Sequence, residues 1–129
     1  MRWLVDGMNL IGSRPDGWWR DRAGAMRRLA DELDAFAAAR PGDPVTVVFD
    51  GRPRDVGEHR HLAEVAFAPG GRNAADHEIA RRVASDAEPS DLAVVTSDKE
   101  LVDRVRAAGG TVESVGRFRD RLGAASRRH

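Results

Sequence analysis

Short apolar runs alternate with longer segments of helical periodicity along the chain, and this alternation constrains the fold more than any other feature. The runs at residues 45–49 and 92–96 are rich in β-branched residues and almost continuously apolar, which is typical of strands covered on both faces. A shorter run at 3–5 predicts a first strand, and 62–68 and 111–115 predict two weaker ones. We therefore expect an α/β fold with a mostly parallel central sheet of about five strands, flanked by helices.

The segments between these strands carry apolar residues three and four positions apart, as in helices with one buried face. Four helices are predicted, over residues 18–40, 73–87, 101–108 and 118–125. Their expected buried stripes are Trp19, Ala23, Met26, Ala30, Leu33 and Ala37; Ala75, Ile79, Val83 and Ala87; Leu101, Val102, Val105 and Ala108; and Phe118, Leu122 and Ala125. Two polar, Gly- and Pro-containing segments, 12–17 and 51–61, are expected to be loops.

Length and composition exclude several classes of protein. The chain has 129 residues, so we expect one domain over residues 1–129, with a basic tail from about residue 124. It contains no cysteine, which excludes disulfides, thiolate metal sites and cysteine nucleophiles. Its 21 basic and 21 acidic side chains balance, so no global field attracts nucleic acid or membrane. No apolar run is long enough for a signal peptide or a membrane span, and we expect a cytoplasmic protein that is a monomer or weak dimer.

Aspartates follow the predicted strands. Asp6, Asp50 and Asp98 come at or just after strand ends, and Asp76 lies in the first turn of a predicted helix. In a parallel sheet the carboxyl ends of the strands meet at one edge, where ligands bind. Clustered carboxylates repel one another unless they share protons or bind cations. Hard oxygen ligands suit Mg²⁺ or Mn²⁺ better than zinc, so the sequence favours such a site.

Each aspartate also has a purely structural interpretation. Asp6-Gly7 and Asp50-Gly51 have the composition of turns. Asn73 is a candidate helix N-cap, and Asp76 then complements the dipole of the helix. Ser97-Asp98-Lys99-Glu100 fits a capping box in which Ser97 is the cap. Singly these interpretations are as good as a functional one, but together they leave the recurrence of aspartate at successive strand ends unexplained.

Four motifs, in this order, resemble those of the NYN domain group in the PIN-like nuclease superfamily, and most closely its YacP-like branch. They are L-V-D-G-M-N-L-I at 4–11, V-V-F-D-G at 47–51, A-A-D-H-E-I-A at 74–80 and V-V-T-S-D-K-E-L at 94–101. The resemblance extends from residue 3 to about 116. It implies a PIN-like three-layer fold and a metal-dependent ribonuclease that cleaves RNA endonucleolytically. Because the YacP-like branch includes ribosome-associated endonucleases, it also implies the ribosome as a partner.

The resemblance also assigns roles to individual residues. It implies that Asp6, Asp76 and Asp98 coordinate Mg²⁺ or Mn²⁺, and that Asp50 either coordinates metal or braces a loop. Asn9 would join the catalytic residues by orienting Asp6 or a substrate phosphate. The supporting residues would be Thr96, through its hydroxyl, and Ser97. Bound metal would lower the pKa of a water molecule and clamp the attacking and leaving oxygens, which yields a 5′-phosphate and a 3′-hydroxyl.

A neutral protein that binds RNA needs local basic patches, because phosphate contacts supply most of the non-specific affinity. The candidate phosphate-binding residues in loops at the expected site are Arg14, Arg20, Arg22, Arg52, Arg54 and Arg72. The pair Trp18-Trp19 is unusual at a loop-to-helix boundary: Trp19 continues the predicted buried stripe, whereas Trp18 lies off it and packs in the core or stacks on a base. His59, His61 and His77 receive no catalytic role, and His77 is expected to point away from Asp76.

Other functions remain open at this point. The main alternative is a non-catalytic RNA- or protein-binding module with a PIN-like fold, or a toxin-like PIN protein controlled by a partner. A haloacid-dehalogenase-type phosphatase is disfavoured, because it needs a second aspartate where this chain has Met8. A dinucleotide-binding domain is also disfavoured, because the turn after the first predicted strand lacks the G-x-G-x-x-G motif. A cation bound among Asp6, Asp76 and Asp98, or Mn²⁺-dependent RNA cleavage lost in Asp98→Asn, would distinguish the nuclease from the binding module.

Overall fold

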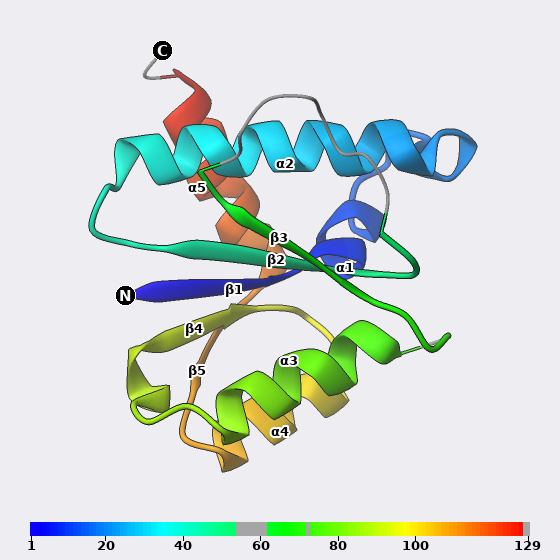
Figure 1. Cartoon of the computed structure of the whole chain (residues 1–129). Coiled ribbons are helices and arrows are strands. Elements are labelled where there is room, and N and C mark those ends of the chain that lie inside the picture. The colour runs from blue at the N-terminus through cyan, green and yellow to red at the C-terminus, as the bar shows by residue number, and fades with distance from the viewer. Residues whose placement is uncertain (54–61, 72, 128–129) are drawn as a thin grey trace.

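The computed structural model describes residues 1–53, 62–71 and 73–127 and contains a five-stranded, entirely parallel sheet with the order β3-β2-β1-β4-β5 (Figure 1). Its strands are β1 (Arg2–Asp6), β2 (Val45–Asp50), β3 (Glu64–Ala68), β4 (Leu92–Val95) and β5 (Thr111–Glu113). All five predicted strands are present, and the α/β fold class is confirmed. The strand order changes direction at β1, so ligand-binding residues are expected where β1 and its neighbours β2 and β4 end.

Helices cover both faces of this sheet and make a three-layer structure (Figure 1). The helices are α1 (Gly7–Gly12), α2 (Arg22–Ala39), α3 (Ala74–Ala84), α4 (Lys99–Ala107) and α5 (Val115–Arg127), with single 3₁₀ turns η1 (Trp18–Arg20) and η2 (Pro89–Asp91). Helices α1, α2 and α5 pack on one face, and α3 and α4 pack on the other.

Alternation along the strands divides the core into two halves. Val5 and Val47 belong to the half under α2 and α5, whereas Leu4, Val48 and Val94 belong to the half under α3 and α4. Because both faces are buried, each strand must be apolar at consecutive positions, which explains the uninterrupted apolar runs in the sequence. The same alternation directs the residues that follow Leu4, Val48 and Val94 by two positions toward α3 and α4.

The sequence does not predict helix α1, because residues 7–12 show no clear helical pattern and Asp6-Gly7 also has the composition of a turn. In the structure Gly7 is the first residue of the helix, with no intervening loop. A Cβ atom on Gly7 would lie 2.5 Å from the Phe49 ring, so the chain can turn sharply here only because this residue has no side chain. The close approach depends on β2, which is distant in the sequence.

The predicted burial of Trp19 is wrong, whereas Trp18 packs against the core, which was one of the two alternatives for it. Trp18 is partly buried and packs on the core, whereas Trp19 is 59% exposed. Trp19 does not belong to the buried face predicted for residues 18–40, because residues 18–20 form a separate 3₁₀ turn after Gly17, whose φ is 74°. Helix α2 begins only at Arg22, with Asp21 accepting a hydrogen bond from the Gly24 amide at 2.9 Å. Trp19 is therefore not in phase with the buried face of α2.

Two smaller boundaries also differ from expectation. Helix α3 ends at Ala84, so Ala87 lies beyond it and is exposed rather than part of its buried stripe. Helix α4 begins at Lys99, earlier than its apolar pattern indicates, because Asp98 forms its N-terminal cap.

Candidate functional site

The strand-end aspartates lie at one edge of the sheet, on the side of α3 and α4. Asp6 and Asp50 are the last residues of the adjacent strands β1 and β2. They follow Leu4 and Val48 by two positions, and both of those residues belong to the core half under α3 and α4. Asp76 lies in the first turn of α3, and Asp98 precedes α4. Four segments far apart in the sequence thus bring carboxylates to the same place.

Asp6 is the most deeply buried of these carboxylates, at 3% exposure. The hydroxyl of Thr96, itself 1% exposed, donates a hydrogen bond to Asp6 Oδ2 at 3.1 Å. The same Thr96 oxygen accepts the backbone N–H of Asp98 at 3.1 Å. Thr96 therefore connects the end of β1 to the start of α4 and orients the Asp6 side chain between them.

The site is electrostatically strained. Burial, followed by repulsion from the Asp76 and Asp50 carboxylates, raises the pKa of Asp6 to about 7, against the opposing effects of the Thr96 hydroxyl and the Asn9 backbone N–H. Burial also raises the pKa of Asp76, with repulsion from Asp98 and Asp50 adding to it, while a hydrogen bond with Asp6 and the proximity of His77 oppose the shift. Electrostatic repulsion therefore links the four aspartate carboxylates, which the strand-end pattern predicts to lie together.

Asp50 holds the N-terminus of α3. Its Oδ1 accepts the backbone N–H of Ala75 at 2.8 Å, so a strand-end residue caps a helix that begins 24 residues later in the chain. The expected cap, Asn73, instead adopts a left-handed conformation with φ 65° and makes no side-chain cap hydrogen bond. This corrects the N-cap prediction. The contact between β2 and α3 also positions Asp76, which follows Ala75 directly.

Asp98 rather than Ser97 caps α4. Asp98 Oδ1 accepts the backbone N–H of Leu101 at 2.9 Å, so the capping-box prediction with Ser97 as the cap is wrong. Ser97 instead joins neighbouring segments: its hydroxyl accepts the Val115 N–H at 3.2 Å, and its own N–H donates to Asn9 Oδ1 at 2.9 Å. Asn9 thus fixes the loop between β4 and α4 against α1.

A small hollow opens beside the carboxylates, and His77 contributes to it. Its volume is about 110 Å³, and its lining includes Asp76, His77, Asp98, Glu100 and Arg104. Arg104 Nη1 lies 3.1 Å from His77 Nδ1. His77 is exposed and lines the same hollow as Asp76, and Arg104 is a residue that the sequence did not single out. Position 104 lies six residues after Asp98 on the same helix, and helical spacing alone leaves its direction ambiguous.

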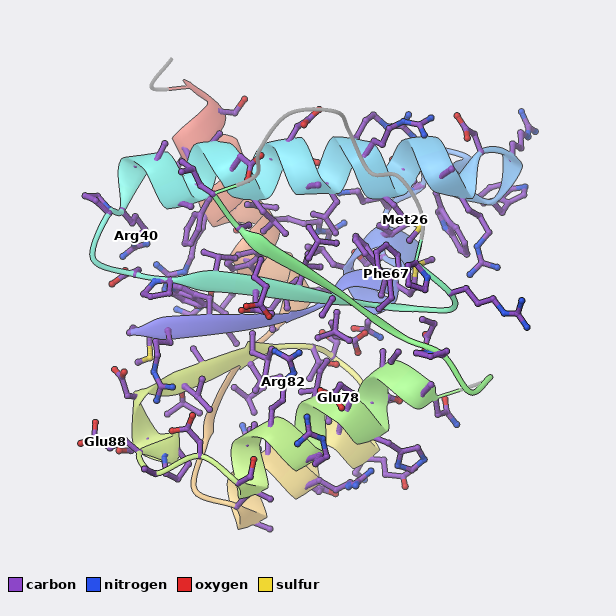
Figure 2. The ribbon with its side chains drawn as sticks, in the orientation of Figure 1. Met26, Arg40, Phe67, Glu78, Arg82 and Glu88 are labelled. Atoms are coloured by element: carbon purple, nitrogen blue, oxygen red, sulfur yellow. The ribbon has the colours of Figure 1, made fainter. Side chains whose placement is uncertain are left out.

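A second, wider hollow of about 500 Å³ continues past His77 along the end of β3 and the start of α3. It includes Phe67, Pro69, Glu78 and Arg81. Glu78 and Arg82, labelled in Figure 2, form an ion pair at 2.7 Å on α3, and Arg81 is also bound to Glu78, at 2.8 Å. These ion pairs fix the side-chain arrangement next to the carboxylate edge.

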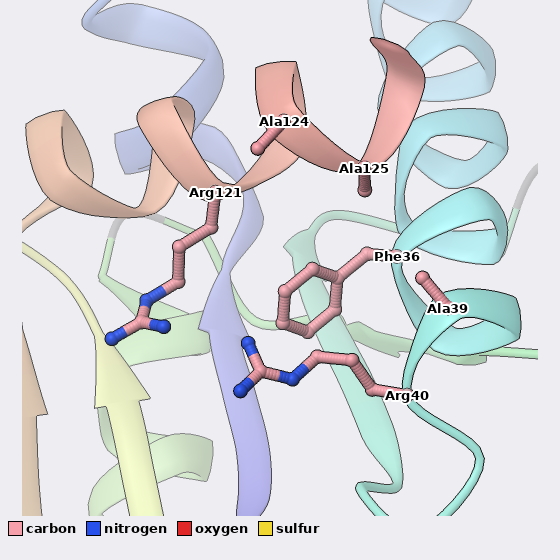
Figure 3. Close-up of a pocket in the computed structure, with 6 residues that line it drawn as sticks. All are labelled: Phe36, Ala39, Arg40, Arg121, Ala124 and Ala125. Atoms are coloured by element: carbon pink, nitrogen blue, oxygen red, sulfur yellow. The ribbon is translucent and has the colours of Figure 1, made fainter. Parts of the chain in front are cut away.

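A third hollow lies between α2 and α5, away from the carboxylates. It has a volume of about 400 Å³, and Figure 3 shows the guanidinium groups of Arg40 and Arg121 extending along it beside Phe36. Arg40 follows the last turn of α2, at the end of the molecule away from α1 and Asp6 (Figure 1). Both arginines are paired, with Asp43 at 3.1 Å and Glu113 at 2.6 Å. This cavity contains none of the strand-end aspartates.

The donor set around Asp6 consists of hard carboxylate oxygens, which fit Mg²⁺ or Mn²⁺. Within residues 1–53, 62–71 and 73–127, no three carboxylate or histidine side chains form a ready-made group that could hold one ion. Magnesium commonly uses only one or two protein carboxylates and keeps several waters. The Asp6 and Asp76 pair meets that smaller requirement, and their hydrogen bond and raised pKa values are the signature of carboxylates that lack a counter-charge.

The predicted phosphate-binding arginines differ in their surroundings. Arg14 is held by Glu32 through two hydrogen bonds of 2.7 and 2.9 Å. Arg20 lies beside Trp19, and Arg52 is exposed just after Asp50. Arg54 and Arg72, like His59 and His61, lie outside the described residues.

No helix in the described part of the chain combines the length and apolar character that crossing a bilayer requires.

Comparison with known proteins gives consistent results. The family model described as the YacP-like NYN domain matches residues 3–129. The crystal structure of Rae1 (YacP) from Bacillus subtilis superposes with a TM-score of 0.79 at 23% identity, over 99% of this chain and 76% of that one. The structure of its W164L mutant gives a TM-score of 0.75 at 25% identity, over 99% and 77%. No curated protein matches the sequence significantly.

Proposed function

The chain belongs to the YacP-like NYN domain family, and on this basis we propose that it is a divalent-metal-dependent ribonuclease that cleaves RNA endonucleolytically at the carboxyl edge of its sheet. The family has a PIN-like fold, and its members are generally nucleases. The observation that carries the proposal is the buried Asp6 carboxylate, which shares one field with Asp76 and Asp50 although nothing positive neutralises it among the described residues. Carboxylates with strongly raised pKa values cluster at functional sites, which supports a role for this one in chemistry.

Asp6 and Asp76 would hold the metal, and Asp98, which lines the hollow beside Asp76, would be the third carboxylate. Bound Mg²⁺ or Mn²⁺ supplies an activated water and charge stabilisation for in-line displacement at phosphorus. The remaining roles belong to the protein itself. Thr96 keeps Asp6 oriented through its 3.1 Å hydrogen bond, and Asn9 keeps the loop before Asp98 in place through its 2.9 Å contact with Ser97.

Arg104 would bind a phosphate of the substrate next to the carboxylates. It is the cation in the hollow that Asp76 and Asp98 line, and its contact in the described part of the chain is the His77 ring rather than a carboxylate. A contact with an imidazole ring does not neutralise the guanidinium as a carboxylate would, so the charge of Arg104 stays available. The planar guanidinium group matches the geometry of a phosphate, so Arg104 would position the RNA backbone. It would not act as a general acid or base, because its guanidinium stays protonated.

The test is cleavage of an unstructured RNA and of a circular RNA with Mg²⁺ or Mn²⁺, compared with EDTA. We expect cleavage of both RNAs, products with 5′-phosphates, and loss of activity in Asp6→Asn and Asp98→Asn. Asparagine is a good N-cap, so Asp98→Asn should keep α4 intact. Asp103→Asn, an exposed change on the same helix, is the matched control and should remain active. Cleavage that persists in both site variants would contradict the proposal. Ribosome-bound RNA should be tested beside free RNA, because the family resemblance implies that partner.

One observation favours a second function, a non-catalytic RNA-binding module. No ready-made three-ligand group exists among the described residues, and a protein that only binds RNA needs none. In that case the wild type would bind RNA equally well in EDTA and in Mn²⁺ and would leave circular RNA intact under every condition. The same set of reactions therefore separates the two functions.

A further inference from the structure

Trp19 is an exposed aromatic side chain on a fixed support. It is 59% exposed, and its ring meets that of Trp18 edge-on, with centroids 6.1 Å apart and planes at 87°. Trp18 is partly buried against the core, and its ring reaches the end of α1, because a Cβ on Gly12 would lie 3.9 Å from it. The backbone of η1 is closed by the Arg20 N–H to Gly17 carbonyl bond at 3.0 Å. Trp19 is therefore held outward by its surroundings.

This tryptophan pair lies beyond the same carboxyl edge of the sheet as the carboxylates, but on the face that α1 and α2 cover, whereas the carboxylates face α3 and α4. Helix α1 starts directly after Asp6 and ends at Gly12, where it meets Trp18. Six helical residues span about 9 Å, so the support of Trp19 begins within about two helical turns of the buried carboxylate. An RNA strand bound at the carboxyl edge would therefore have to extend over about the length of α1 to reach Trp19.

One arginine lies at each ring of the tryptophan pair. The Arg20 guanidinium carbon lies 5.9 Å from the Trp19 centroid, and that of Arg22 lies 5.8 Å from the Trp18 centroid. Neither arginine forms an ion pair with any residue that the structure describes, in contrast to Arg14, which Glu32 neutralises. The aspartates in this segment are engaged with backbone, since Asp16 accepts the Trp18 N–H at 3.2 Å and Asp21 caps α2. The surface thus combines an apolar ring with two available positive charges.

We propose that Trp19, with Arg20 and Arg22 beside it, is a stacking site for an unpaired base of the RNA strand whose backbone passes the carboxylate edge. The identity of that strand rests on the proposed ribonuclease function. Exposed aromatic rings combined with cations are the features that bind single-stranded nucleic acid, because every base offers a flat face and its phosphate a negative charge. A duplex keeps its base faces covered, so the site selects single-stranded RNA.

The test is binding of a labelled, unstructured oligoadenylate in EDTA, where metal-dependent cleavage cannot occur. We expect Trp19→Leu to weaken binding about tenfold, which is within the range of one lost stacking contact, and Trp19→Phe to retain part of the affinity. Tryptophan fluorescence of the wild type should be quenched by the RNA, and the quenching should be much smaller in Trp19→Leu. Leu62→Ala is the matched control, because Leu62 is also an exposed apolar residue, at 67%, in another segment. Thermal melting verifies that each variant is folded.

The outcomes separate this inference from the proposed function. Unchanged affinity and unchanged quenching in Trp19→Leu would overturn the inference, even if the wild type cleaves RNA. An equal loss of affinity for a duplex of the same length would also overturn it, since stacking requires unpaired bases. Loss of single-strand binding in Trp19→Leu, in a protein that cleaves no RNA under any condition, would support the stacking site and refute the ribonuclease. Preserved cleavage in Trp19→Leu at saturating RNA, with a raised KM, would support both.

Discussion

Replacing Asp6 with asparagine should stabilise the metal-free protein, and by an amount that depends on pH. The Asp6 carboxyl has a pKa of about 7 in the folded protein, against an ordinary value of 3.8. Between these values the folded state binds a proton that the unfolded chain has released, so stability falls as pH rises through this window. The shift of about 3 units corresponds to about 4 kcal/mol, and this is an upper limit because Asp76 shares the proton.

Asparagine removes the charge and keeps the shape. Its carbonyl oxygen can accept the Thr96 hydroxyl, and its amide group can donate to Asp76 in place of the shared proton. We therefore expect Asp6→Asn to raise the free energy of unfolding in EDTA by about 2–4 kcal/mol near pH 8. Near pH 4 the wild-type carboxyl is already protonated, so the two proteins should be nearly equal in stability.

The measurement is urea denaturation of both proteins in EDTA at intervals from about pH 4 to pH 8. The quantity to follow is the difference in unfolding free energy between variant and wild type, because the other titrating groups cancel in it. Asp103→Asn, at an exposed position, should give a difference that does not change with pH. Mg²⁺ near pH 8 should then stabilise the wild type, by about 2.7 kcal/mol at a hundred times its Kd, and not Asp6→Asn. An Asp6→Asn difference that is independent of pH, or that reverses sign near pH 8, would refute the reasoning.

Three further predictions test the surroundings of the site. Gly7→Ala should destabilise the protein by about 1–3 kcal/mol in urea denaturation, because the new Cβ would lie 2.5 Å from the Phe49 ring; a change below about 0.5 kcal/mol would contradict this. Asp50→Ala should lower the free energy of unfolding by about 0.5–2 kcal/mol, because the cap of α3 is lost, whereas Asp50→Asn should keep the cap. If Asp50→Asn is as stable as the wild type and still loses RNA cleavage, Asp50 is a metal ligand. Arg2 lowers the pKa of Asp86 to about 2, so this ion pair stabilises the fold above about pH 4 and its contribution is lost toward pH 2. The fall in melting temperature between pH 4 and pH 2 should therefore be smaller in Arg2→Gln than in the wild type. An equal fall in both proteins would exclude a stabilising ion pair.

The sheet was predictable because its signal is local and repeated. Each central strand is an apolar run bounded by polar residues, and burial on both faces makes that run continuous. Helix α1 was not predictable for a physical reason. Asp6-Gly7 has the composition of a turn, and whether Gly7 can begin a helix against the sheet depends on Phe49, which lies 42 positions away in the sequence. Local patterns do not contain that contact.

The caps of α3 and α4 also could not be predicted correctly from local sequence. Sequence rules assign a cap to the nearest suitable side chain, which favoured Asn73 for α3 and Ser97 for α4. The structure uses Asp50, from another strand, and Asp98, one position later. The exposure of Trp19 arises similarly, since residues 18–20 form a separate 3₁₀ turn and Trp19 does not share the phase of α2.

For the candidate site, the meeting of the aspartates followed from sheet topology alone. Parallel strands end at one edge, and alternation along β1 and β2 places Asp6 and Asp50 on the same face. The depth of Asp6 and the effect on its pKa could not be inferred, because they depend on how closely α3 and α4 cover that edge. The contact between His77 and Arg104 joins two helices, and its prediction would require their relative rotation.

Capping and metal binding are not alternatives for the aspartates at this edge. Oδ1 of Asp50 accepts the Ala75 N–H, and Oδ1 of Asp98 accepts the Leu101 N–H, while the second oxygen of each makes no hydrogen bond within the described residues. Each cap fixes a carboxylate in place through one oxygen and leaves the other available to a cation. The N-termini of α3 and α4 also offset part of the repulsion among these charges, because helix N-termini favour negative groups. A substitution by asparagine keeps the cap and removes the charge, whereas alanine removes both, so only the asparagine variants separate the chemistry of the site from the stability of its helices.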